Sequence, residues 1–420
     1  MRRLSPFLTL SRGIRRRGGP TPPPDFPPQT TTGTSAGILD EAATFSDVHT
    51  VVLNPTTRLP YPERELRDHL EKSSREVLKE KNKAKYGTSK KKSSDVVFDH
   101  IPLEEQMFLL FPGQGAQFVG MGKKVVDCPA SKRLFEEANE YLGYNLTKIC
   151  HEGPSTKLDQ TLYCQPAVFV SSLAALEKLK EQQGGSEAVD RITHVAGFSV
   201  GEYAAMVAGG MLSFSDALKI VKIRAEAMHE CNQLVASGMM TVKVNASSRL
   251  EDAMQAARQK AREAGEMEVC EIANFLFCGV RVVGASQLCM DFLEEYQQDY
   301  NFQVVKRLAV SGAFHTRQMD SAVEKVRKAV QEVKLQPARC NVYSNFTGSI
   351  FPARKAEIRQ AIFKQVNSPV KWEQIQQLLY RKHQDFTFPR FIEVGPGRQL
   401  GAMLLQTSKK AYKNYEHFSC

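Results

Sequence analysis

The chain has 420 residues, of which 42% are hydrophobic and 24% are charged. An apolar fraction of this size excludes a wholly disordered protein, and no stretch approaches the run of about 18 apolar residues that a membrane-spanning helix needs. The 56 Lys and Arg residues outnumber the 46 Asp and Glu residues, which gives a formal net charge of +10.

Much of the excess positive charge lies at the N-terminus. Residues 1–24 hold six arginines interleaved with Leu and Phe, and no acidic residue precedes Asp25. This composition predicts a mitochondrial transit peptide over residues 1–24. A basic nucleic-acid-binding arm and a disordered start are the alternatives.

Residues 25–100 are predicted to form a flexible extension or linker. Pro, Gly and Thr dominate residues 18–40, which favours a spacer, and the charge pairs over residues 62–85 are consistent with a peripheral helix. A lysine cluster between Lys79 and Lys92 contains a single aromatic residue, Tyr86, so it offers little for base stacking. We therefore expect no nucleic-acid partner.

From residue 101 onward, short apolar runs alternate with helical patterns. The predicted strands are Met107–Phe111, Ile192–Ala196, Asn341–Ser344 and Phe391–Val394. The predicted helices are Pro129–Tyr141, Ala167–Gln182 and Ser215–Cys231, the last with Ser213 or Ser215 as its N-cap. Buried strands that alternate with helices predict an α/β core with a mainly parallel sheet.

The pattern changes between residues 239 and 308. Strands are predicted at Met240–Val244, Val269–Asn274, Val280–Gly284 and Phe302–Leu308, and helices at Arg249–Ala264 and Gln287–Gln297. The order β-α-β-β-α-β is that of a ferredoxin-like unit. We therefore expect a subdomain over residues 239–308, inserted between core segments 101–238 and 309–420.

Gly197–Gly201 is a G-x-S-x-G sequence between a predicted strand and a predicted helix. A sharp strand-to-helix turn exposes the serine hydroxyl, and the helix N-terminus stabilises negative charge that develops beside it. Ser199 is therefore the candidate nucleophile. The alternative is an ordinary glycine turn with a capping serine.

A serine hydroxyl needs a base to become a nucleophile. His315 has the best context for this role, because it follows an apolar segment and lies among small residues. His194, in the predicted strand before Ser199, is the competing candidate, although a histidine buried in a sheet is more often structural.

Phe111–Gln117 (FPGQGAQ) is a glycine-rich loop that follows a strand. It could cradle a phosphate, although G-x-x-x-x-G-K-[ST] and G-x-G-x-x-G are both absent, or it could donate a backbone N–H to an oxyanion. The N–H of Val200 is the natural second donor. Arg224, on an amphipathic helix, is either a surface charge or a bidentate ligand for a carboxylate.

The chain carries, in this order, Phe111–Gln117, Thr161–Ala167 with Gln165-Pro166, Gly197–Ala205 (GFSVGEYAA), Arg224, Ser311–His315 (SGAFH), Ser368–Trp372 (SPVKW) and Glu393–Gly397 (EVGPG). Together these segments resemble the malonyl-CoA:acyl carrier protein transacylase family and the related acyltransferase domains of polyketide and fatty-acid synthases. The resemblance covers residues 105–410, and the Arg-rich start is similar to that of a mitochondrial member. It implies an α/β-hydrolase-like core with an inserted ferredoxin-like subdomain.

The resemblance implies catalytic roles for the matching residues. Ser199 matches the acylated nucleophile and His315 the general base. Gln114 and Val200 match the backbone donors of the oxyanion hole. A backbone carbonyl within Ser368–Lys371 is expected to orient His315 in place of an acid.

Substrate contacts are implied in the same way. Arg224 matches the arginine that binds the malonyl carboxylate, and Gln165 matches a glutamine that lines the pocket. Phe314, the residue before the histidine, resembles its counterpart in malonyl-selective members. The usual Asn-Ser-Pro segment of the family appears here as Asn274–Phe277.

The implied reaction moves a malonyl group from malonyl-CoA to the phosphopantetheine thiol of acyl carrier protein through malonyl-Ser199, in mitochondrial fatty-acid synthesis. We expect these two partners, a location in the matrix, a monomer, no membrane span and no cofactor, because the CoA thioester is itself a substrate. The nine scattered cysteines include no C-x-x-C pair, which favours reduced thiols over disulfides or a metal site.

Two other functions could use the same residues. One is a serine hydrolase or thioesterase, although hydrolases with this core order their triad Ser…Asp/Glu…His, whereas 105 residues follow His315. The other is a non-catalytic scaffold built on a transferase fold, which intact Ser199, His315 and Arg224 argue against.

Overall fold

The computed structural model describes residues 96–310, 312–381 and 387–420. The predicted transit peptide, the predicted helix over residues 62–85 and most of the predicted extension lie outside the described residues. The last part of that extension contacts the core, because the Val96 N–H donates to Asn341 Oδ1 (2.8 Å) and Asn341 Nδ2 donates to the Val96 carbonyl (2.9 Å). The chain is therefore attached to the core before Ile101, where the globular part was predicted to begin.

The larger part of the molecule is built on a six-stranded sheet with the order β11-β10-β1-β2-β7-β8. Every neighbouring pair is parallel except β7 and β8. The strands are β1 (Met107–Phe111), β2 (Ile192–Gly197), β7 (Asn341–Ser344), β8 (Ser349–Ile350), β10 (Arg390–Val394) and β11 (Tyr415–Phe418).

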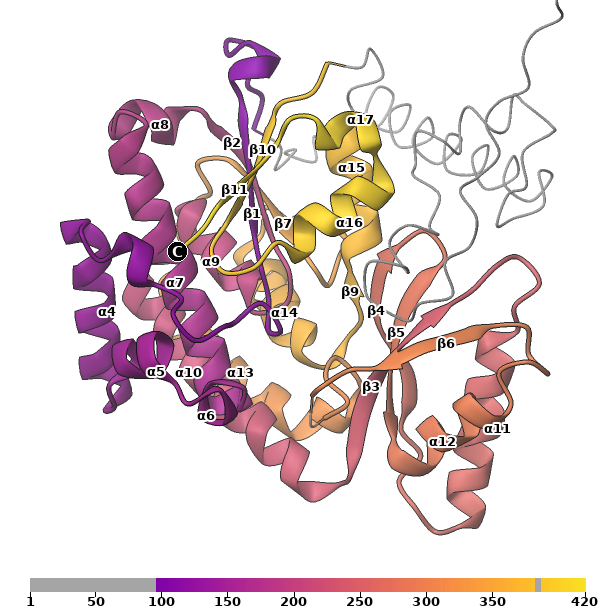
Figure 1. The fold of residues 1–420 in the computed structure, drawn as a ribbon. Helices are drawn as coiled ribbons and strands as arrows, with labels where there is room; N and C mark the ends of the chain where they lie inside the picture. Colours follow the sequence, from indigo (N-terminus) through magenta and orange to yellow (C-terminus); the bar gives the residue numbers. More distant parts are fainter. Residues whose placement is uncertain (1–95, 311, 382–386) are drawn as a thin grey trace, which may run out of the picture.

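Helices cover both faces of this sheet, which explains why β1 is apolar at every position (Figure 1). Met107, Leu109 and Phe111 pack in one apolar cluster, whereas Phe108 and Leu110 pack in another. The helices of the first face are α4 (Pro129–Leu142), α5 (Leu146–Glu152), α6 (Ser155–Leu158), α7 (Thr161–Gln182), α9 (Gly201–Ala208), α10 (Phe214–Leu234), α13 (Asp320–Glu332) and α14 (Lys355–Lys364). Those of the second face are α15 (Trp372–Arg381), α16 (Gln399–Thr407) and α17 (Lys409–Tyr412). The short α8 (Ser186–Asp190) precedes β2.

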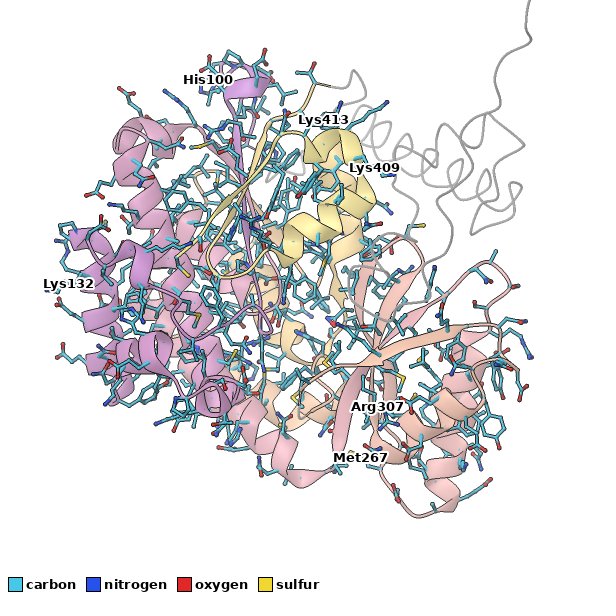
Figure 2. All side chains as sticks on the ribbon, viewed as in Figure 1. His100, Lys132, Met267, Arg307, Lys409 and Lys413 are labelled. Carbon is cyan, nitrogen blue, oxygen red and sulfur yellow. The ribbon has the colours of Figure 1, made fainter. Side chains whose placement is uncertain are left out.

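The smaller part has the predicted β-α-β-β-α-β order. Its elements are β3 (Ser237–Lys243), α11 (Leu250–Glu263), β4 (Cys270–Phe277), β5 (Val280–Ser286), α12 (Gln287–Glu295) and β6 (Gln303–Arg307). The four strands are antiparallel in the order β6-β3-β5-β4, and α11 and α12 cover one face with an apolar cluster of their own. In Figure 2, Arg307 and Met267 mark this subdomain, and Lys132 marks the helical side of the core.

A short strand of the core extends the sheet of the small subdomain. β9 (Val370–Lys371) pairs in parallel with β4, Asn274 lying opposite Val370 and Phe275 opposite Lys371. The two parts of the molecule are therefore joined by main-chain pairing as well as by chain connections.

The predicted fold class is confirmed: an α/β core with a mainly parallel sheet, and an inserted ferredoxin-like unit. The details differ at element ends. α7 begins at Thr161, with Pro166 inside its first turns, and Ser213 is the N-cap that accepts the Asp216 N–H at the start of α10. No helix of the described residues is long and apolar enough to cross a bilayer.

Candidate active site

The site begins at the turn between β2 and α9, where Ser199 has a left-handed backbone conformation with φ of 53°. The turn is sharp because its glycines lack side chains. A Cβ on Gly197 would lie 1.9 Å from the Gly201 carbonyl oxygen, and one on Gly201 would lie 2.3 Å from the Phe111 carbonyl oxygen. The predicted turn thus brings the serine against the end of β1, at the carboxyl edge of the sheet.

Ser199 and His315 are in direct contact, with 2.8 Å between Oγ and Nε2. The other ring nitrogen, Nδ1, lies 2.8 Å from the carbonyl oxygen of Gln365. A carbonyl can only accept, so we assign the proton of the neutral ring to Nδ1, which leaves the Nε2 lone pair to accept the serine O–H. This arrangement allows the imidazole to act as a base toward the hydroxyl.

The carbonyl in hydrogen-bond contact with His315 Nδ1 lies just before the predicted segment, although the backbone of Ser368, the first residue of that segment, also acts on the ring to raise its pKa. Ser368–Lys371 was expected to supply it, but the hydrogen bond comes from Gln365, three residues earlier, within the 3-10 turn η4 (Gln365–Asn367). That turn directs its first carbonyl toward the ring, whereas Val370 and Lys371 pair with β4. The predicted replacement of an acid by a backbone carbonyl is observed, with a different residue.

Arg224 lies on the inner face of α10 and is 0% exposed, so its interpretation as a surface charge is wrong. Its Nη2 donates to Ser199 Oγ (3.0 Å) and to Gln365 Oε1 (3.1 Å), and its Nη1 donates to Gln165 Oε1 (2.6 Å). These acceptors are neutral oxygens, and Nε has no partner among the described residues. The guanidinium is thus buried beside the candidate nucleophile, and its Nε–H group is still able to donate a hydrogen bond.

Burial and charge shape the titration of the site. Burial lowers the pKa of His315 to about 3, and the positive charge of Arg224 acts in the same direction. Burial raises the pKa of Glu202 to about 8, although the Asn345 N–H, Gln365 and Arg224 oppose the shift. His315 is therefore neutral at pH 7, the protonation state that a base requires.

The glycine-rich loop after β1 lies against the same turn. A Cβ on Gly113 would lie 2.5 Å from the Phe198 carbonyl oxygen, and Gln114 Nε2 donates to Thr161 Oγ1 at the start of α7 (3.3 Å). Within the described residues, the backbone N–H groups of Gln114 and Val200 donate to no protein acceptor. Both predicted oxyanion donors are thus on segments that meet at Ser199 and have unused N–H groups.

The other predicted residues lie around this centre or away from it. Phe314 is buried in the main apolar cluster next to His315 in sequence. Asn274 is buried on β4 where that strand pairs with β9, between the two parts of the molecule. His194 lies near the start of β2, with its ring 4.0 Å from that of Phe108 and its Nε2 3.2 Å from Asn341 Nδ2, which does not favour it as the base.

Comparison with known proteins supplies the family. The model of the acyl transferase domain matches residues 108–417. The chain belongs to the acyltransferase family. It is 42% identical to the mitochondrial malonyl-CoA-acyl carrier protein transacylase of Homo sapiens, over 73% of this chain and 78% of that protein. It is 39% identical to the mouse protein of the same name, over 81% of this chain and 88% of that protein.

A solved structure supports the same family. The acyl-carrier-protein S-malonyltransferase of Burkholderia pseudomallei superposes with a TM-score of 0.63 at 26% sequence identity, covering 74% of this chain and 96% of that one. The acyltransferase family thus accounts for both the core and the inserted ferredoxin-like unit.

Three residues at the centre of this acyltransferase site were missed by the sequence prediction. Gln365 donates to the Ser199 carbonyl (2.8 Å), Asn345 Oδ1 accepts the Ser199 N–H (2.7 Å), and Glu202 accepts the Asn345 N–H (2.5 Å). Glu202 could have been suspected, since an acid directly after G-x-S-x-G points inward from the first turn of the helix. Asn345 and Gln365 come from segments 146 and 166 residues away from Ser199 and carry no local signal.

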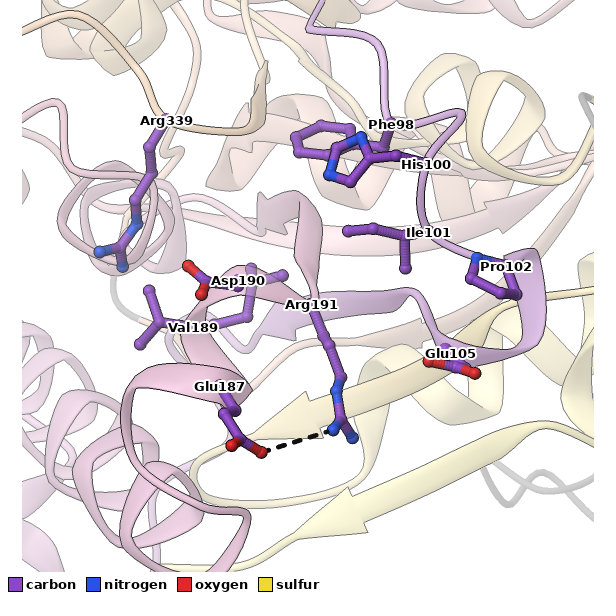
Figure 3. A pocket seen from close by; sticks show the side chains of 11 residues that line it. Phe98, His100, Ile101, Pro102, Glu105, Glu187, Val189, Asp190, Arg191 and Arg339 are labelled. Atoms are coloured by element: carbon purple, nitrogen blue, oxygen red, sulfur yellow. Dashed lines mark ion pairs between the residues drawn. The ribbon is translucent and has the colours of Figure 1, made fainter.

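A cavity of about 600 Å³ lies at the opposite edge of the main sheet (Figure 3). The segment 98–102, α8 and Arg339 line it, and Arg191 forms an ion pair with Glu187 (3.9 Å) at its wall. It lies where β1 and β2 begin, whereas Ser199 follows the end of β2. The cavity is therefore separate from the acyltransferase site.

Proposed function

We propose that this chain transfers the malonyl group of malonyl-CoA to the phosphopantetheine thiol of acyl carrier protein, through a malonyl-Ser199 intermediate. The observation that carries the proposal is the position of Arg224. A fully buried guanidinium that donates to the nucleophile oxygen, and has no carboxylate acceptor among the described residues, is matched to an acyl group with a free carboxylate. The names of the human and mouse relatives support the same substrate and carrier.

The first half-reaction acylates the enzyme. Nε2 of His315 takes the proton of the Ser199 hydroxyl while Oγ attacks the thioester carbonyl carbon. The negative oxygen of the tetrahedral intermediate accepts the N–H groups of Gln114 and Val200, each such donor lowering the barrier by about 3 kcal/mol. The C–S bond then breaks, and the CoA sulfur leaves with the proton held by His315.

The second half-reaction transfers the malonyl group to the carrier. His315 takes the proton of the phosphopantetheine thiol, whose sulfur attacks the carbonyl carbon of malonyl-Ser199. The ester C–O bond breaks, and Ser199 recovers its proton from His315. Kinetics are therefore ping-pong. Throughout both steps Arg224 holds the malonyl carboxylate, Gln165 holds Arg224, and Phe314 narrows the apolar side of the pocket.

The proposal is tested by single-turnover acylation with malonyl-CoA, methylmalonyl-CoA and acetyl-CoA. We expect a malonyl adduct on Ser199 by mass spectrometry, formed faster than the other adducts and discharged by carrier thiol faster than by water. Faster discharge by water would identify a hydrolase, and the absence of an adduct would support a non-catalytic protein.

The cellular context belongs to the same proposal. The relatives named above are mitochondrial, and the Arg-rich residues 1–24 are consistent with import into the matrix for fatty-acid synthesis. We propose a monomeric enzyme that needs no cofactor or metal. Light scattering tests the monomer, import into isolated mitochondria tests the destination, and activity after dialysis against a chelator tests the metal.

A further inference from the structure

Asn345 contacts the nucleophile turn from the end of β7, the strand that pairs with β2 in the main sheet. It directly follows β7, is 0% exposed, and uses both ends of its amide on the turn. Oδ1 accepts the Ser199 N–H (2.7 Å) and Nδ2 donates to the Gly197 carbonyl (2.7 Å). One side chain therefore bridges the two residues that flank Phe198.

The bridge constrains a backbone conformation that is unfavourable by itself. Ser199 has φ of 53°, which serine adopts only when its surroundings impose it. The two hydrogen bonds from Asn345 fix the peptide planes before and after Phe198, and so the direction in which Ser199 Oγ leaves the turn. The Asn345 backbone is fixed in turn, because its N–H donates to Glu202 Oε2 (2.5 Å) on α9.

The same contact determines which backbone donors remain available. With its N–H bonded to Asn345, Ser199 cannot donate that group to a substrate oxygen. The Val200 N–H, one residue later, has no acceptor among the described residues and is left for the oxyanion. A rotation of the peptide between Phe198 and Ser199 would move Oγ. It would also change which N–H group, that of Ser199 or that of Val200, is free to donate to a substrate oxygen.

We propose that Asn345 is a positioning residue for acyl transfer at Ser199, which sets the approach of Oγ and reserves the Val200 N–H for the oxyanion. The proposal rests on the acyl transfer proposed above. It assigns no substrate contact to Asn345, so its loss should lower the acylation rate constant and leave the affinity for malonyl-CoA nearly unchanged.

The first test replaces the side chain by one of similar size without hydrogen bonds. Asn345→Leu is expected to lower the single-turnover acylation rate about 10²-fold, with KM for malonyl-CoA changed less than threefold, because misplacing a reacting atom costs about that much. Labelling of Ser199 by a fluorophosphonate should slow in parallel. Wild-type rates in a folded Asn345→Leu variant would overturn the proposal.

A matched control separates positioning from stability. Asn341 is a buried asparagine on β7 whose side chain bonds Val96 and contacts His194, away from Ser199. Asn341→Leu should lower the melting temperature and still acylate at nearly the wild-type rate. An equal loss of acylation in Asn341→Leu would show that packing at β7, and not the bridge, sets the rate.

A second variant keeps the test valid if Asn345→Leu does not fold. Asn345→Asp preserves the acceptor for the Ser199 N–H, but it can donate to the Gly197 carbonyl only when its carboxyl is protonated. Its acylation rate relative to that of wild type should rise as pH falls, because protonation restores the donor to the Gly197 carbonyl. A ratio that is flat with pH would overturn the proposal.

The two proposals fail in different ways. If the wild-type protein forms no malonyl adduct, the proposed function is wrong, and fluorophosphonate labelling of Ser199 still measures the effect of Asn345. If the wild type is malonylated and the Asn345 variants match it, only the positioning role is wrong.

Discussion

Arg224 and Ser199 are joined by a hydrogen bond of 3.0 Å from the guanidinium Nη2 to the hydroxyl Oγ, in a pocket where the cation is completely buried. Because the two groups are in direct contact, the guanidinium lies within reach of a short acyl group attached to the nucleophile. Once an acyl carbonyl is attached to Oγ, a carboxylate two carbons further along can reach the guanidinium. A longer chain would overshoot the cation, and an acetyl group would offer it no carboxylate.

The first prediction concerns this clamp. Arg224→Ala should lower kcat/KM for malonyl-CoA about 10²-fold and leave that for acetyl-CoA nearly unchanged, because a buried carboxylate loses its charged partner. Parallel assays with both thioesters measure the ratio. Arg224→Lys is the control: it keeps the charge but loses the planar fork, so its ratio should fall between those of wild type and Arg224→Ala. An unchanged malonyl preference in Arg224→Ala would rule out the clamp.

The second prediction distinguishes the two histidines considered as the base. His315→Ala should reduce the single-turnover acylation rate by about 10³-fold, within the range that general bases contribute. His194→Gln should retain most of the rate, because that ring packs against Phe108 near the start of β2. Rapid-quench mass spectrometry measures both. A larger loss in His194→Gln would reverse the assignment.

The third prediction is the pH dependence of acylation. With the pKa of His315 lowered to about 3, the imidazole stays neutral as pH falls from 7 to 5. The logarithm of kcat/KM, which reports the free enzyme, should therefore be flat over that interval. The free energy of unfolding behaves differently. Below about pH 6.5 the unfolded chain binds a proton on this histidine while the folded chain does not, so the free energy of unfolding decreases as pH falls from 6.5 toward 3. An acid limb centred near pH 6.5, with circular dichroism unchanged, would contradict this account.

The fourth prediction concerns Glu202. Its pKa is raised to about 8, so the folded state holds a proton that the unfolded state releases above about pH 4.5. Below pH 4.5 both states hold the proton, and the contribution of this group to the free energy of unfolding is at its maximum. Between pH 4.5 and 8 only the folded state keeps the proton, so the free energy of unfolding falls as pH rises, by a few kcal/mol in total. Glu202→Gln, which cannot titrate, should flatten the dependence of the free energy of unfolding on pH between 6 and 9. Urea unfolding at each pH measures it, and equal slopes for the two proteins would exclude Glu202 as the source.

Local patterns predicted the fold well where adjacent residues determine the structure. The run Met107–Phe111 is apolar at each position because both faces of β1 are covered, and the glycines around Ser199 permit a turn that any side chain would block. The ferredoxin-like order was likewise visible because each of its elements has its own periodicity. β9, with two residues, and β11, with alternating polar residues, gave no such signal.

The site was predictable only in part for the same reason. Ser199 and His315 stand in recognisable local sequences, and their contact at 2.8 Å followed from the family resemblance. Gln365 and Asn345 act through hydrogen bonds to the backbone of Ser199, from segments that the fold alone brings there. No periodicity encodes such contacts, and this is why the carbonyl that orients His315 was assigned three residues too late.

The pairing of β9 with β4 has a mechanical consequence for catalysis. The ladder anchors the chain five residues after Gln365, whose carbonyl aims the imidazole, to the sheet of the inserted unit. A hinge that swung this unit outward would pull on the backbone that aligns the base. Movement of the inserted unit is thus coupled to the alignment of His315, so an engineered loosening of the β9–β4 pairing should lower turnover before it changes which acyl groups are accepted.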